Sequence, residues 1–379
     1  MIGLDWPVGH HHQVFAGIQR YARECGRWDC LINPYADLLF KGPGHDPGID
    51  GVVARATPEL AERARAARVP VVNVWMNSAA KDLPTVIHDA AESGRMIARH
   101  LLARGFRTFA CLGFEGIVGI QAQVDGFREV IGTMGYSCVE CRVSPEYDHT
   151  ATNWLVFQEQ LSQWMDRWSP SMGVMTSNDL LCRYLAEACR QRSIAIPNAV
   201  ALVGSGNEVL VDTAAFPTLS SVDFGFDRVG HRAAELLDAL MDGAPAPAAP
   251  LMLPPVSLVT RQSSDAFVVD DAMVAAALHF ITEHLHEDID VEQVADHVAT
   301  TRRTLSRRFH ARLGKTIHDS ITQLRLERVK QQLIQSKAVL KSIAKECGFR
   351  DAIHLCKVFQ RIEGTSPSDY RAERTVRER

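Results

Sequence analysis

The sequence predicts an α/β fold of two lobes over residues 1–262, a linker at residues 263–272 and an all-α region over residues 273–375. Three observations favour this division. A chain of 379 residues exceeds what one core of ordinary size organises. Short β-branched runs alternate with helical stretches as far as Val259, and from Ala272 onward the pattern is helical throughout.

Composition excludes several classes of protein. With 46% hydrophobic and 23% charged residues and no apolar run of eighteen, neither a disordered chain nor a membrane span fits. The segment Met1–Asp5 begins as a strand, without the basic and apolar regions of a signal peptide, so we expect no export. Nine cysteines, an odd number on a long chain, are typical of reduced thiols. We therefore expect a cytoplasmic protein.

The charge is distributed unevenly along the chain. Residues 1–272 carry 22 Lys and Arg against 31 Asp and Glu, whereas residues 273–379 carry 19 against 14. All 19 of these cations lie from Thr301 onward, where only 8 acidic residues accompany them. Such asymmetry suggests a polyanionic partner for the tail, although a solvated helical surface is the alternative.

Strand candidates in the α/β part lie at residues 51–53, 69–74, 108–112, 173–175 and 200–203, and helices are expected at residues 92–104 and 180–191. Strands that alternate with helices imply parallel sheets covered by helices, with ligands at the carboxyl ends of the strands. About 260 residues are enough for two such lobes. The proline-rich run 244–255 predicts a stiff extended connector, and residues 256–260 still have the pattern of a strand, so the linker begins after them.

Two helix pairs follow the linker. Asp290 and Gln293 have the spacing of a capping box, and a second helix is expected from Thr301 to a stop at Gly314. Its inward positions are Leu305, Phe309 and Leu313, which leaves for solvent or DNA the side chains of Arg302, Arg303, Ser306, Arg307 and His310. The pattern recurs at residues 341–349 and 351–360, and residues 317–336 predict one long helix between the two pairs. These are two helix-turn-helix units on a rigid connector, which suits successive major-groove segments.

Over residues 273–373 the sequence resembles the AraC family of DNA-binding regulators. The match rests on Leu305-x-Arg307-x-Phe309, Gly314, Ile343-Ala344-x-x-x-Gly348-Phe349, Phe359 and the closing run from Gly364 to Arg371. The resemblance implies base-reading positions at Arg303, Ser306 and Arg307 with Arg302 nearby, and at Ile353, His354, Cys356 and Lys357. For Arg308, Arg312, Lys341 and Lys345 we expect phosphate contact or plain solubility. An inert helical bundle is the alternative to DNA binding.

The first 262 residues resemble the LacI-like, type I periplasmic-binding-protein sensors. The match rests on Gln13-Val14-x-x-Gly17, Asn153-Trp154 with Trp164, Asp179 after its strand, Gly204-x-x-Asn207-Glu208 and Pro254-Pro255-Val256. Such sensors hold a sugar between two lobes, which implies the ligand-binding candidates Asp5, Trp6, His88, Asp89, Gln123, Asn178, Asp179, Asn207 and Glu208. For each, a helix-capping or hinge role is the alternative. The family has arginine at Gln123 and aspartate at Gly206, and these departures argue against xylose itself as the ligand.

Other motifs have bland interpretations. His10-His11-His12 lacks accompanying metal ligands, and Cys138-x-x-Cys141 has no second pair, so no metal site is predicted. Gly204-Ser205-Gly206 lacks the third glycine of a dinucleotide turn, and no cofactor is implied. No catalytic triad or phosphate loop is recognisable, so no enzyme is predicted.

Together the resemblances imply a transcriptional activator of carbohydrate catabolism. Its expected partners are double-stranded DNA, a sugar or sugar-derived effector, RNA polymerase and a second copy of the chain as a homodimer, with no membrane. The alternative is a DNA-binding protein whose sensor has lost its ligand. A pure sugar-binding protein ranks third, because the sequence shows no export signal.

Overall fold

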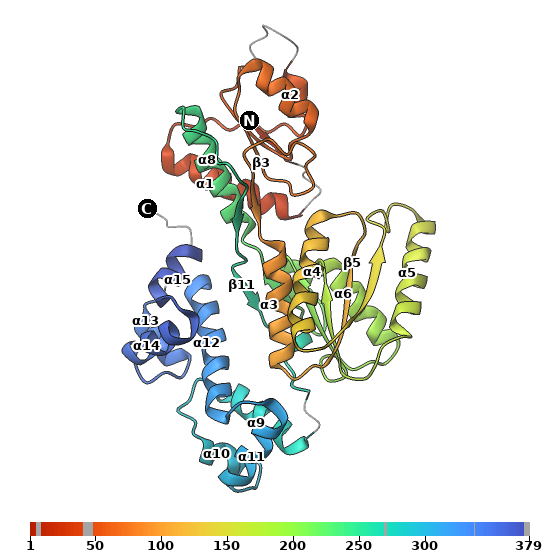
Figure 1. Ribbon diagram of the computed structural model, residues 1–379, viewed down its shortest axis with the longest axis vertical. Coiled ribbons are helices and arrows are strands. Elements are labelled where there is room, and N and C mark those ends of the chain that lie inside the picture. The colour runs from red at the N-terminus through yellow and green to blue at the C-terminus, as the bar shows by residue number, and fades with distance from the viewer. Residues whose placement is uncertain (5–8, 41–47, 269–270, 337, 375–379) are drawn as a thin grey trace.

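The computed structural model describes residues 1–374 except 5–8, 41–47, 269–270 and 337. The first lobe has a parallel sheet of order β1-β2-β3, formed by Ile2–Gly3, Val52–Ala54 and Val71–Asn73. Two long helices pack on it and on each other, α1 (Gly9–Cys25) and α8 (Phe226–Met241), accompanied by α2 (Pro58–Ala67) and the 3-10 helix η1 (Ala36–Leu39). The strands β4 (Val86–His88) and β10 (Leu251–Leu253) pair in parallel nearby. Figure 1 shows this lobe at the top.

The second lobe is a six-stranded sheet of order β11-β9-β8-β7-β5-β6. Its strands are β5 (Thr108–Phe114), β6 (Cys138–Val143), β7 (Met172–Thr176), β8 (Val200–Ser205), β9 (Ser220–Asp223) and β11 (Ser257–Val259). All pairs are parallel except β11 with β9, a departure from the parallel sheet that the sequence predicts. The core on one face includes α3 (Ala90–Ala103) and α4 (Val118–Thr133); the core on the other includes α5 (Ala151–Met165) and α6 (Asp179–Gln191). The short helices α7 (Val209–Ala214) and η2 (Gln262–Ser264) complete it.

The chain passes between the lobes three times, at β4 to α3, at β9 to α8 and at β10 to β11. Each lobe is therefore built from separate stretches of sequence. The proline-rich connector returns the chain from α8 through β10 to β11, which explains why it is extended without marking the end of the α/β part.

The remaining helices are α9 (Ala272–Glu283), α10 (Val291–His297), α11 (Arg302–Leu313), α12 (Ile317–Gln335), α13 (Leu340–Glu346), α14 (Ala352–Glu363) and α15 (Pro367–Arg374). They enclose two small cores. One gathers around Leu305 and Phe309, the other around Phe359 and Tyr370. The helix α12 contributes Ile321 to the first core and Val329 to the second, so it ties both units together.

Within the part of the chain that the structure describes, no helix is long and apolar enough to cross a membrane. The same residues contain no cluster of three or more His, Cys, Asp or Glu side chains placed to hold a metal ion.

Candidate functional site

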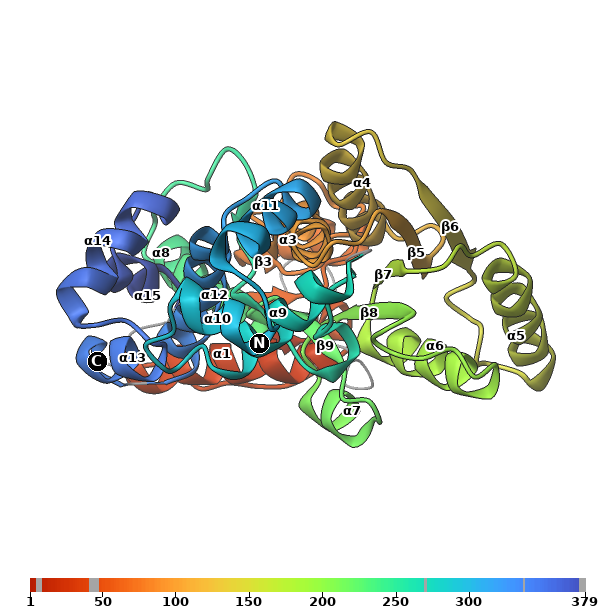
Figure 2. The same ribbon diagram turned by 90° about the horizontal axis from the view of Figure 1, so that it is seen from below.

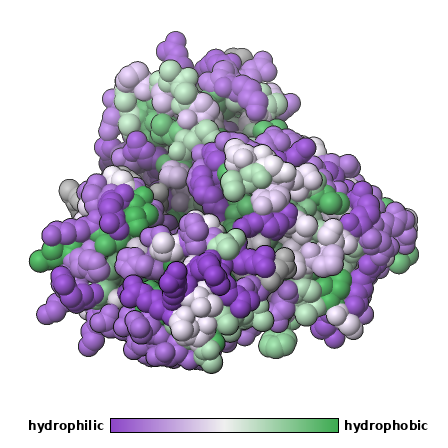
Figure 3. Space-filling model, turned by 60° about the horizontal axis from the view of Figure 1, so that its bottom comes forward, coloured by the Kyte–Doolittle hydropathy of each residue, from purple (hydrophilic) through white to green (hydrophobic). Residues whose placement is uncertain are grey.

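The helix α11 presents its polar face to solvent. Thr301 caps it by accepting the backbone N–H of Thr304, and Leu305 and Phe309 are fully buried beneath it. This leaves exposed the predicted DNA-binding residues Arg302, Arg303, Arg307 and His310, with Ser306 half-buried. Hydrophilic side chains gather over this end of the molecule in Figure 3, and Figure 2 shows α11 and α14 from below.

The helix α14 is built in the same way. Asp351 caps it, and Leu355, Val358 and Phe359 face the core. Of the predicted DNA-binding residues, Ile353, His354 and Lys357 are exposed and Cys356 is half-buried. Ile353 exposes 69% of its surface although it is apolar, which suits contact with a thymine methyl. The structure thus leaves seven of the nine predicted residues exposed on α11 and α14 and two, Ser306 and Cys356, half-buried.

The two units are locked together through α12. Its Arg325 donates from Nε to the Leu285 carbonyl at 3.1 Å and from Nη2 to the Glu287 carbonyl at 2.6 Å. Gly348, in the turn of the second unit, has φ +74° and lies so close that a Cβ there would be 2.1 Å from the Leu285 oxygen. The second turn therefore abuts the segment between α9 and α10, which helps to fix the separation of α11 and α14.

Arg308 has a structural role that the sequence did not reveal. Its Nε donates to Asp271 at 2.7 Å, and Asp271 also caps α9 by accepting the N–H groups of Met273 and Val274. The guanidinium thus holds the start of α9, so Arg308 has a contact within the protein that does not involve DNA.

A cleft of about 470 Å³ lies between the two lobes, at the carboxyl ends of their strands. Four of the predicted ligand-binding residues line it, namely His88, Gln123, Asn178 and Glu208. Glu208 lies between the lobes, because a Cβ built on Gly9 at the start of α1 would be 3.3 Å from its Oε1. A cleft of this size and position is where two-lobed α/β proteins take small molecules.

One wall of the cleft is polar and comes from the second lobe. Gln123 donates from Nε2 to Ser205 Oγ at 2.7 Å, and Ser205 donates in turn to the Thr176 carbonyl at 3.1 Å. Asn178 accepts the Leu181 N–H at 2.7 Å and caps α6. By contrast, the Ser177 hydroxyl is buried and has no hydrogen-bond partner in the described structure. A buried hydroxyl without a partner is costly, and Ser177 is one of the residues that line the cleft.

The facing wall is aromatic. His10 stacks on Phe226 with centroids 4.7 Å apart, and His88 packs against Phe224 at 4.4 Å. Burial lowers the pKa of His10 to about 3 and that of His88 to about 4, so both imidazoles are neutral near pH 7. Trp75 lines the same cleft. A flat, uncharged wall of this kind suits the apolar face of a sugar ring.

The other predicted ligand-binding residues that the structure describes, Asp89, Asp179 and Asn207, do not line the cleft. Asp89 caps α3 by accepting the Glu92 N–H, and Asn207 bonds to Arg261 and Asp223. Asp179 is fully buried beneath the cleft, where it accepts the Glu208 N–H at 2.8 Å and the Ser221 hydroxyl at 2.6 Å. Its contacts favour a role in positioning Glu208. Asp5 and Trp6 lie outside the described residues.

Several lining residues were missed by the sequence reasoning. His10 and His11 were considered only as metal ligands, whereas the structure places both in the cleft wall. The others include Trp75, Asn77, Phe114, Ser177, Ser205, Phe224 and Phe226. A stricter search of the residues at and just after strand ends would have found Trp75, Ser177 and Ser205, because β3, β7 and β8 end within two residues of them.

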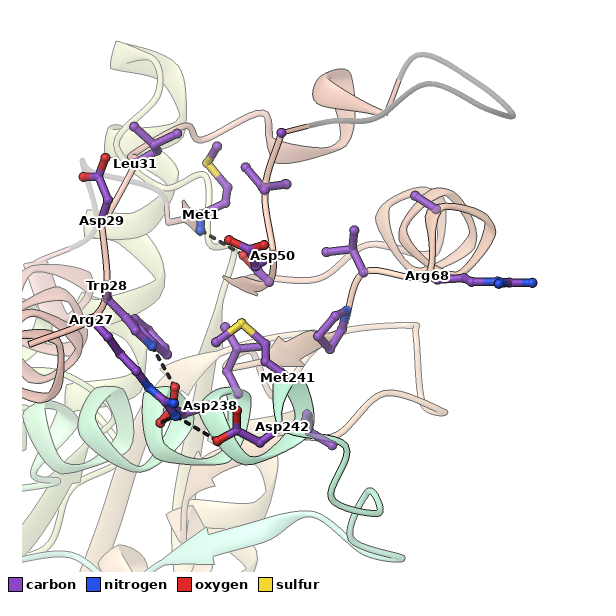
Figure 4. A pocket seen from close by; sticks show the side chains of 18 of the residues that line it. Met1, Arg27, Trp28, Asp29, Leu31, Asp50, Arg68, Asp238, Met241 and Asp242 are labelled. Carbon is purple, nitrogen blue, oxygen red and sulfur yellow. Dashed lines mark hydrogen bonds and ion pairs between the residues drawn. The ribbon is translucent and has the colours of Figure 1, made fainter. Parts of the chain in front are cut away.

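A larger hollow of about 1040 Å³ lies at the opposite edge of the first lobe, at the amino ends of its strands (Figure 4). Several of its polar groups already bond to one another. Arg27 bonds to both Asp238 and Asp242, Trp28 donates to Asp238, and the Met1 amine donates to the Gly51 carbonyl. Of the predicted ligand-binding residues that the structure describes, none lines it.

A two-lobed α/β domain with an open cleft, joined to two helix-turn-helix units with exposed basic helices, defines a DNA-binding transcriptional regulator. Two family models match accordingly: a periplasmic-binding-protein-like domain over residues 98–264 and a helix-turn-helix domain over residues 294–373. The chain is homologous to the xylose operon regulatory proteins. It is 27% identical to the one from Haemophilus influenzae, over 96% of this chain and 95% of that protein, and 29% identical to the one from Escherichia coli K12, over 96% and 94%.

The solved structure of a xylose-binding transcription activator has the same architecture. It superposes with a TM-score of 0.59 at 25% identity, covering 98% of this chain and 97% of that one. The similarity therefore includes both the lobes and the helical region.

Proposed function

We propose that this chain is a transcriptional activator whose DNA binding is controlled by an uncharged sugar held in the cleft between its lobes. The observation that carries the proposal is the unpartnered hydroxyl of Ser177, a residue that lines a cleft of about 470 Å³ in the same chain as two exposed recognition helices. The relatives named as xylose regulators support the sugar class. The proposed role is regulatory, not enzymatic, and is exerted in the cytoplasm with RNA polymerase as a further partner.

The lining chemistry favours an uncharged ligand over a sugar acid or phosphate. Among the described lining residues there is no Lys or Arg, and Glu208 supplies negative charge. An anion would therefore be desolvated without a compensating cation, which is costly. The aromatic wall and the amide and hydroxyl groups opposite it fit a ring with one apolar face and several hydroxyls. Gln123 and Gly206 stand where the sensor family has an arginine and an aspartate. D-xylose is therefore tested as one sugar among several.

The direct test is titration calorimetry of the full chain with D-xylose, L-arabinose, L-fucose and D-galacturonate. We expect at least one neutral sugar to bind and the acid to fail. Ser177→Ala should weaken that binding by about 1–3 kcal/mol if the hydroxyl bonds the ligand. Without ligand, the same variant should melt no lower than the parent, because no protein hydrogen bond is lost. Absence of binding by every neutral sugar would favour the alternative of a DNA-binding protein with a silent sensor.

We further propose that the protein is a homodimer that pairs through the sensor. The helix α7 protrudes from the second lobe (Figure 2) and carries Leu210, 86% exposed, with Phe216 just beyond it, 88% exposed. Large apolar side chains at such exposure are typical of a covered surface. Replacing both by glutamate should yield monomers in sedimentation at micromolar concentration. A parent that is already monomeric, with and without DNA, would refute the dimer.

A further inference from the structure

The sensor and the DNA-binding helices meet at the end of α3. Arg104, immediately after α3, is almost completely buried, and its Nε has no partner within the described structure. Its Nη1 lies 3.8 Å from Glu327 on α12, the helix that joins the two helix-turn-helix units. The linker closes over the same place, since the Val268 N–H donates to the Arg104 carbonyl at 2.8 Å. A buried guanidinium needs a carboxylate nearby, and here α12 supplies it.

Arg104 is oriented by a directional chain of hydrogen bonds inside the sensor. Its Nη1 contacts His100 Nδ1 at 2.9 Å, and because a guanidinium only donates, Nδ1 is the acceptor. His100 is thereby held in the tautomer that donates from Nε2 to Ser264 Oγ, at 2.7 Å. Ser264 donates to Ser220 Oγ at 2.8 Å, and Ser220 donates to the Arg261 carbonyl at 2.9 Å.

The chain continues to the floor of the cleft. Arg261 donates from Nη2 to Asn207 Oδ1 at 2.7 Å, and Asn207 directly precedes Glu208, which lines the cleft. The serines and His100 are buried, so water does not compete with these bonds. A continuous set of buried and half-buried contacts thus runs from the cleft to α12.

We infer that Arg104 is a positioning residue: it holds α12, and with it both recognition helices, in a fixed orientation against the sensor through Glu327. Movement of Glu208 in the cleft, and of the adjacent Asn207, reaches α12 through Arg261, Ser264 and His100. This inference concerns the connection between the domains and stands whether or not the effector is a sugar.

Hydrogen–deuterium exchange on the full chain tests it without any ligand. Glu327→Gln removes the charge on α12 and leaves the sensor sequence unaltered. We expect amide exchange in residues 100–106 and 264–268 of the sensor to rise at least about threefold, as when one coupling contact is lost. Arg104→Met should raise exchange along α12, and Arg104→Lys should restore most of the protection.

The matched control is Glu363→Gln. Glu363 lies on α14 and pairs at 3.0 Å with Lys330, which lies on α12 as Glu327 does. Loss of the Glu363 charge should therefore leave the exchange of residues 100–106 unchanged. The double variant Arg104→Met with Glu327→Gln should show no more exchange than the stronger single variant, because both remove one contact. Parent-like exchange in the sensor of Glu327→Gln, or additive effects in the double variant, would overturn the inference. If Arg104→Met fails to fold, the Glu327 variant alone decides.

Discussion

Arg303 and Lys345 differ in what they offer DNA, although both are exposed cations. Arg303 lies on the outer face of α11, whereas Lys345 lies on α13, the helix that precedes α14. We expect Arg303→Ala to cost about 1–3 kcal/mol on a site selected from random DNA and to relax one base position. Lys345→Ala should weaken all sequences alike. Footprints and titrations on selected and random DNA measure both, and equal losses on the two DNAs for both variants would contradict the assignment.

Asp179 and Ser177 should respond oppositely to removal of their polar groups. Asp179 accepts two hydrogen bonds, so Asp179→Asn should lower the free energy of unfolding by about 1–3 kcal/mol. It should weaken effector binding only indirectly, through the position of Glu208. Ser177→Ala should weaken effector binding without lowering the free energy of unfolding. Urea unfolding and calorimetry on both variants separate the roles. An Asp179→Asn protein as stable as the parent would return Asp179 to the ligand-binding set.

These residues show how far sequence reasoning reaches. The outer faces of α11 and α14 were predictable, because helical period alone decides which side chains point outward. The cleft was predictable in part: His88 and Asn178 stand at or just after strand ends, whereas Gln123 lies within α4 and was found only through the resemblance. That Asp179 turns inward to Ser221 depends on β9, which no local pattern announces.

At the scale of elements, two glycines with the same backbone angle make a matched test of the contact between the helix-turn-helix units. Gly348 and Gly364 both have φ +74°, but a Cβ would be 2.1 Å from the Leu285 oxygen at Gly348 and would meet nothing within 4 Å at Gly364. Either alanine pays the left-handed strain of about 1 kcal/mol. Gly348→Ala should cost at least about 1 kcal/mol more, and also loosen DNA binding. Equal melting temperatures for the two variants would mean that the units are not locked together.

The helix α7 contains a buried carboxyl group whose titration should be visible. Burial and the nearby charge of Asp179 raise the pKa of Asp212, although Arg261 opposes the shift. A carboxyl group with a raised native pKa holds its proton longer when folded, so its contribution to stability falls as pH rises above the ordinary value of 3.8. Asp212→Asn removes this penalty. Its stability relative to the parent should therefore grow by about 1–3 kcal/mol between about pH 5 and pH 8. A gap that is constant with pH in urea unfolding would contradict the raised pKa.

Elements differ in how clearly the sequence announces them. The capping box at Asp290 and Gln293 and the stop at Gly314 are local signals, and the structure has both. The pairing of β10 with β4 joins residues far apart in the chain. The strand β11 pairs in the antiparallel direction with β9, and nothing in its own residues indicates that direction. Long-range pairing has no local signature, which is why the three crossings between the lobes were not predicted.

At the scale of the whole molecule, one chain carries both a ligand cleft and a DNA-binding region. A ligand shifts only the state that it binds better, so a sugar that closes the lobes must change the orientation of α12 to be felt at DNA. The domain boundaries at residues 262 and 273 stay a prediction. The contact between Arg104 and Glu327 places the two parts against each other.

The most direct measurement is the dissociation constant of the full chain for a DNA site selected from random sequence, with and without D-xylose, L-arabinose and L-fucose. The account predicts that at least one of these neutral sugars changes the constant about tenfold or more, equivalent to about 1.4 kcal/mol. It also predicts that Ser177→Ala reduces this response. Selective DNA binding that none of the sugars alters, or binding that does not distinguish selected from random DNA, would contradict it.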